Sequence, residues 1–91
     1  MTLSREEILA IKAGYELDRL VAREIFSVGE RKQWIRCYYS TLIDFTGEII
    51  EKIFMDNLLH QFFALVEEIA PHRTFPETIC KAALIAKLNS R

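Results

Sequence analysis

Long apolar runs are missing from this 91-residue chain. No stretch approaches the ~20 consecutive apolar residues that a membrane-spanning helix needs. The beginning, from Met1 to Ser4, is followed at once by charged residues and lacks the apolar core of a signal peptide. We therefore expect a cytoplasmic protein that does not enter a membrane.

An excess of charge of either sign is also missing. Twelve Lys and Arg residues face thirteen Asp and Glu residues, and the formal net charge is −1. A chain without a basic field cannot neutralise many phosphates, so nucleic acid is disfavoured as a partner. Cysteine is scarce too, because only Cys37 and Cys80 occur and they form no CxxC pair. We expect both to be free thiols.

Signatures of catalysis and of metal binding are absent. The sequence holds no GxSxG, P-loop, GxGxxG or HExxH pattern. Its soft ligands are His60, His72, Cys37 and Cys80, and none of them is paired at a metal-ligand spacing. Cys80 is a nucleophile candidate in principle, but it lies in an alanine-rich helical pattern where a packed thiol is commoner. We predict no enzyme, no cofactor and no metal.

Two segments carry the same helix-start signal. Ser4 precedes Glu7 by three residues, and Thr74 precedes Glu77 by three residues. Both fit the capping box, in which a hydroxyl caps the helix and the Glu reaches back to the cap amide. Thr41 and Asp44 form a weaker start signal of the same kind. These signals frame a compact helical domain.

Apolar residues at helical spacing predict five helices. Gly14 separates the first two as a stop signal, and Pro71 ends the fourth. No Gly or Pro occurs between Glu48 and Ala70, so a hairpin there would lack turn residues, and we predict a helix with a kink near Asp56. The predicted ranges are Ser4–Ala13, Tyr15–Ser27, Thr41–Phe54, Asp56–Ala70 and Phe75–Leu88.

A basic and aromatic segment is the strongest pointer to a binding site. Residues 31–39 show partial alternation, which suits a short strand at Gln33–Tyr38. Trp, Tyr and Arg are enriched at binding hot spots. Two other interpretations remain open: Trp34 and Tyr38 complete the core, or the aromatic side chains stack on single-stranded nucleic acid. The predicted binding surface consists of Arg31, Lys32, Trp34, Arg36 and Tyr38.

Three stretches together resemble the phage ABA sandwich family of small phage and prophage proteins: Ser4–Phe26, Tyr39–Ile53 and Phe75–Ala86. The resemblance covers about half of the chain. It implies a phage or prophage origin and a helix–sheet–helix sandwich whose β-hairpin would fall between Phe54 and Arg73. It implies no established activity and no site residue. The chain departs from the family by Leu42 and Gly47, where the family usually has Asp and Trp.

We predict one domain over residues 1–91, mainly α, with four to five helices and one short strand as an option; the alternative is the α+β sandwich. The function that we predict is that of a non-enzymatic phage-type accessory protein. It would bind a host or phage protein, with a homo-oligomer as an option. The first alternative is a protein that binds a small molecule, such as a nucleotide signal, or that inhibits a host defence system. Its pocket would contain Arg31, Arg36 and Tyr38. The second is a weak single-strand nucleic-acid binder.

Overall fold

The protein is a helical domain in the computed structural model, which describes residues 4–26, 39–41, 43–71 and 73–89. These ranges contain α-helices and one short 3₁₀ helix, and no strand occurs within them. The mainly α prediction is confirmed. The elements are α1 (Arg5–Ala10), α2 (Tyr15–Glu24), the 3₁₀ helix η1 (Ile43–Phe45), α3 (Thr46–Met55), α4 (Leu59–Ile69) and α5 (Phe75–Asn89).

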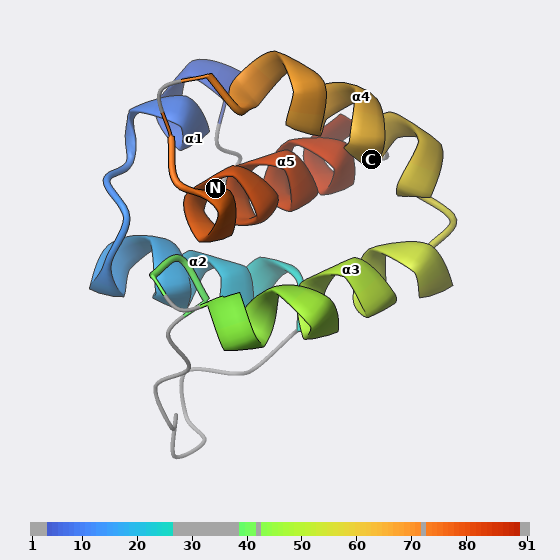
Figure 1. The fold of residues 1–91 in the computed structure, drawn as a ribbon, viewed down its shortest axis with the longest axis horizontal. Coiled ribbons are helices and arrows are strands. Elements are labelled where there is room, and N and C mark those ends of the chain that lie inside the picture. The colour runs from blue at the N-terminus through green and yellow to red at the C-terminus, as the bar shows by residue number, and fades with distance from the viewer. Residues whose placement is uncertain (1–3, 27–38, 42, 72, 90–91) are drawn as a thin grey trace.

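Helix α5 runs through the middle of the domain. It lies between α1 and α4 on one side and α2 and α3 on the other, and it contacts all four (Figure 1). A helix that is apolar nearly all round must be buried on nearly all sides. Its buried positions include Cys80, Ala82, Ala83 and Ala86, whose small side chains let the neighbouring helices approach closely. The other helices each contribute one apolar stripe to this centre.

Helix α1 is short, and polar contacts attach it to the rest. Its capping box is complete: the Ser4 Oγ accepts from the Glu7 amide at 3.2 Å, and the Glu7 carboxylate accepts from the Ser4 amide at 3.3 Å. Lys81 of α5, only 2% exposed, donates from Nζ to the Leu9 carbonyl at 2.8 Å. That carbonyl lies in the last turn of α1, where the helix offers no partner of its own. The Arg5 guanidinium binds the Glu68 carboxylate of α4.

A buried polar network joins the start of α2 to the turn before α3. The Asp18 Oδ1 accepts from the Ser40 amide at 2.8 Å and from the Ser40 hydroxyl at 2.6 Å. The Ser40 Oγ accepts from the Gly14 amide at 2.8 Å. Asp18 and Ser40 are fully buried, and hydrogen bonds to the charged form are what makes a buried carboxylate tolerable. The network therefore fixes where the chain enters α3.

The helix predicted for Asp56–Ala70 is confirmed over Leu59–Ile69. The predicted kink near Asp56 is instead a break between α3 and α4. Asn57 lies in this break with a φ of 60°. Asn tolerates this left-handed conformation better than most residues. The alternative sandwich is wrong here, since the described residues between Phe54 and Arg73 form the end of α3, a turn and α4 instead of a hairpin.

Two boundary predictions are wrong. Gly14 does not end the first helix: α1 ends at Ala10, and Gly14 is the N-cap of α2 with a φ of 144°. Thr41 does not cap the third helix, because η1 intervenes and Phe45 is the N-cap of α3 without a side-chain bond. The Thr74 cap is confirmed, as its Oγ1 accepts from the Glu77 amide at 3.4 Å. The strand predicted at Gln33–Tyr38 lies outside the described residues.

Replacing Gly47 or Gly14 with Ala should change the free energy of unfolding in opposite directions. Gly47 lies in the first turn of α3 with open space around its Cα, so Gly47→Ala should raise the free energy of unfolding by about 0.5–1 kcal/mol. Gly14 also has open space, but its φ of 144° is a conformation that side chains rarely adopt. Gly14→Ala should lower the free energy of unfolding by about 1–3 kcal/mol. Urea titrations of both variants test this, and equal signs would contradict it.

Candidate functional site: an apolar face on α3 and α4

Apolar residues come in adjacent pairs along α3 and α4. The first member of each pair is buried against the centre, and the second member is half-buried or exposed. The pairs are Ile49-Ile50, Ile53-Phe54, Leu58-Leu59, Phe62-Phe63 and Leu65-Val66. One step along a helix is a rotation of about 100°, so the second members form a separate stripe beside the buried one.

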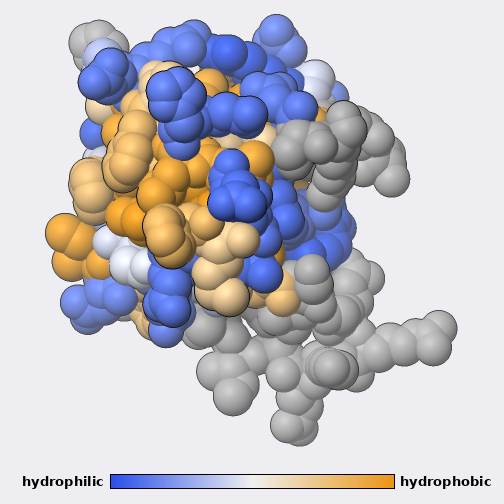
Figure 2. Space-filling model, turned by 90° about the vertical axis from the view of Figure 1, so that its right-hand side faces the viewer, coloured by the Kyte–Doolittle hydropathy of each residue, from blue (hydrophilic) through white to orange (hydrophobic). Residues whose placement is uncertain are grey.

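The two outer stripes turn toward the same side of the molecule. Helices α3 and α4 run in opposite directions with α5 between them (Figure 1). Because both direct the buried stripe at α5, equal rotations in antiparallel helices bring the outer stripes to a common side. We call this surface the α3–α4 face; its residues are Ile50, Phe54, Leu59, Phe63 and Val66. Figure 2 shows apolar surface, with hydrophilic side chains above it and beside it, at the end of the molecule where α3 turns into α4.

The two phenylalanines of the face are more than half exposed. Phe54 is 64% exposed and Phe63 is 54% exposed, whereas Phe62 beside it is fully buried. Ile50, Leu59 and Val66 are partly buried and pack against the core beneath them. Clustered apolar residues on a monomer surface mark interaction sites more often than scattered ones do. Three residues of the face therefore pack against the core, and its two phenylalanines are exposed.

The α3–α4 face is bordered by acidic side chains. Glu51 lies three residues before Phe54, and Glu67 lies four residues after Phe63, which makes each a neighbour of its phenylalanine on the helix surface. Both glutamates are exposed, and neither forms an ion pair in the described part of the chain. Residues 46–70 contain five acidic residues and one lysine, although the charges nearly balance over the whole chain. Of these five, Asp56 and Glu68 are in ion pairs, whereas Glu51 and Glu67 are not.

That one lysine is already partnered. The Lys52 Nζ lies 3.9 Å from the Asp56 Oδ1, and the Lys87 Nζ of α5 lies 3.0 Å from the Asp56 Oδ2. Asp56 thus holds two cations at the turn between α3 and α4. These three groups together carry a net charge of +1, and neither Glu51 nor Glu67 is in an ion pair among the described residues.

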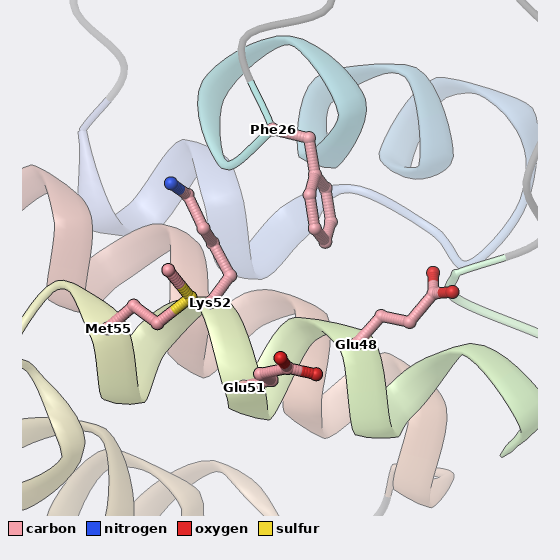
Figure 3. Close-up of a pocket in the computed structure, with 5 residues that line it drawn as sticks. All are labelled: Phe26, Glu48, Glu51, Lys52 and Met55. Carbon is pink, nitrogen blue, oxygen red and sulfur yellow. The ribbon is translucent and has the colours of Figure 1, made fainter.

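A shallow pocket of about 260 Å³ lies on another side of α3. Phe26, just beyond α2, points toward the α3 side chains Glu48, Lys52 and Met55, with Glu51 beside them (Figure 3). Two carboxylates and one ammonium group line it, so it would repel a phosphate-bearing ligand. This pocket does not supply the basic, aromatic site that a nucleotide signal requires.

The described part of the chain offers little chemistry for catalysis. Among its residues no group of three or more His, Cys, Asp or Glu is arranged to hold a metal ion. Cys80 is a free, fully buried thiol. Burial raises its pKa well above the ordinary value of 9.0, and the negative charges of Asp18 and Glu77 raise it further. A nucleophilic cysteine needs the opposite environment. His60 is exposed on α4.

The predicted binding surface, Arg31, Lys32, Trp34, Arg36 and Tyr38, lies outside the described residues, as do Cys37 and His72. That prediction stays a prediction. The apolar period of Asp56–Ala70 predicts a helix but does not separate buried from exposed apolar residues, so the α3–α4 face was missed. The available signal was that two adjacent residues are apolar at each helical repeat. Such a pattern makes an apolar surface broader than one buried stripe requires.

No helix in the described ranges is long and apolar enough to cross a membrane. Comparisons of the chain with protein-family models, with curated proteins and with solved structures find no match.

Adjacent phenylalanines on α4 should respond differently to truncation. Phe62→Ala removes a fully buried ring and should cost about 3–5 kcal/mol of the free energy of unfolding. Phe63→Ala removes a ring that is mostly in water and should cost less than about 1 kcal/mol. Thermal and urea unfolding of the two variants measure the difference. A large loss for Phe63→Ala would place that ring in the core and remove it from the face.

The buried thiol predicts a loss of stability in alkali. The pKa of Cys80 is raised by folding, so its contribution is complete below the unfolded pKa near 9 and is lost as the pH rises above it. From pH 7 to about pH 10, the wild-type chain should lose about 1 kcal/mol more free energy of unfolding than Cys80→Ala. Cys37 is present in both chains, so its effect cancels. Parallel pH profiles would contradict the prediction.

Proposed function

We propose that this chain is a non-enzymatic interaction protein that binds another protein through the α3–α4 face. The observation that supports it most is the exposure of Phe54 and Phe63 on a rigid pair of helices. Aromatic side chains that the fold does not cover contribute little to folding and are suited to provide binding energy when a partner desolvates them. A metal cluster and a reactive thiol would each favour another function, and the described residues provide neither of them.

The face is preorganised for binding. Its residues lie on α3 and α4, and both helices pack on α5. Ile50, Leu59 and Val66 are already fixed against the core, which limits the conformational entropy that binding would remove. This favours a stable docking surface over a segment that folds on its partner.

The finer roles rest on sequence alone. A phage-type accessory protein that binds a host or phage protein is what the family resemblance implies, and it agrees with an interaction function. The homo-oligomer, the nucleotide-signal binder and the single-strand nucleic-acid binder remain predictions. Those that depend on Arg31, Arg36 and Tyr38 involve residues outside the described ranges.

Comparative affinity purification tests the proposed function. Tagged wild-type chain is expressed in its native cells, and recovered proteins are quantified beside those of a Phe54→Ala/Phe63→Ala variant. Phe75→Ala is the matched control, since that ring is 50% exposed at the start of α5 and lies outside the face. At least one protein should be recovered with the wild type and the control and be depleted about tenfold with the double variant. Equal recovery with all three chains would refute the proposal.

A further inference from the structure

We infer that the partner presents a basic amphipathic helix to the α3–α4 face. This inference rests on the proposed function and names the chemistry of what that face binds. Its basis is the combination of an uncovered apolar centre at Phe54 and Phe63 with a carboxylate border at Glu51 and Glu67.

The shape of the face suits a helix. Its α4 stripe runs from Leu59 to Val66, which is about 10 Å along the axis, and α3 adds Ile50 and Phe54 beside it. An amphipathic helix binds such a surface through anchors at i, i+3 or i+4, and i+7. Two turns of a partner helix would match the length of the α4 stripe while keeping its own polar flanks at the border.

The charge selects the partner helix. Among the described residues neither Glu51 nor Glu67 is in an ion pair, and Lys52, the neighbour of Glu51, lies 3.9 Å from Asp56. Lys or Arg on the flanks of the incoming helix would complement these carboxylates, whereas Glu or Asp would meet like charge. Basic side chains also cover apolar surface with their aliphatic stems, so they would extend the contact beyond the central rings.

The same border argues against two other occupants. A second copy of the chain, docked face to face, would bring Glu51 and Glu67 toward the same acidic border on its partner. A membrane surface attracts helices whose polar face is rich in Lys and Arg, and anionic lipid would repel this one. A different protein with a basic helix has neither difficulty.

Three labelled peptides of about 18 residues, long enough to form a helix, test the inference with the full chain. The first carries a leucine stripe flanked by lysines, the second has glutamates in place of the lysines, and the third is a scramble of the first. Fluorescence anisotropy measures binding of each. The lysine peptide should bind about tenfold more tightly than either of the others.

The variants then assign the binding to the face. Phe54→Ala/Phe63→Ala should weaken the lysine peptide about tenfold, and Phe75→Ala should leave it unchanged. Glu51→Gln/Glu67→Gln should weaken it about threefold to tenfold and reduce its salt dependence. Glu6→Gln/Glu16→Gln, at exposed glutamates of α1 and α2, is the charge control and should have no effect.

Several results would overturn the inference. They are equal binding of the lysine and glutamate peptides, indifference to the face variants, a dimer in sedimentation that the double phenylalanine variant dissociates, or binding to phosphatidylglycerol vesicles that this variant abolishes. If the peptides fail while affinity purification still yields a partner dependent on Phe54 and Phe63, the basic helix is refuted and the proposed function stands. If both fail, the face is not a docking site.

Discussion

The burial of α5 on nearly every side is the constraint on which the rest of the structure depends. Four helices pack around it. A chain of this length is too short to build a second hydrophobic core. Ala82, Ala83 and Ala86 keep the surrounding helices close, and each neighbour then needs only one apolar stripe. A charged residue inside such a helix must find partners there, and Lys81 does so by joining the Leu9 carbonyl and the Glu77 carboxylate.

The constraint also explains the exposed face. Once α3 and α4 direct their first stripe at α5, the second stripe has no helix left to cover it within the described ranges. Of the six large hydrophobic side chains that are exposed among the described residues, Phe54 and Phe63 lie on this face, and Tyr15, Ile43, Met55 and Phe75 lie elsewhere.

Helix positions were largely predictable because the local signals are strong. The hydroxyl caps at Ser4 and Thr74 begin helices where expected, and the 3.6-residue period identified α4 without turn residues to contradict it. Gly14 was misplaced because the same left-handed freedom serves a helix start as well as a helix end. Thr41 failed as a cap because η1, at Ile43–Phe45, lies between Thr41 and the first turn of α3. The doubled apolar residues of α3 and α4 indicate a second apolar stripe, but only the position of α5 decides that Phe62 is covered and Phe63 is exposed. The binding surface predicted at Arg31–Tyr38 lies outside the described residues and stays a prediction.

Helix α1 has a consequence for how the domain opens. It has six residues, and Ile8 is its one fully packed side chain among them, so its attachment relies on Lys81, Arg5 and its own cap. So short a helix does not persist when detached. It should behave as a separate cooperative unit whose amides exchange with solvent well before those of α5. When it lifts, the part of α5 that it covers becomes exposed, while α2, α3 and α4 remain packed on α5. Transient opening, and the proteolysis that follows from it, would then be confined to the N-terminal side of the domain, and the surface carrying Phe54 and Phe63 would keep its shape throughout.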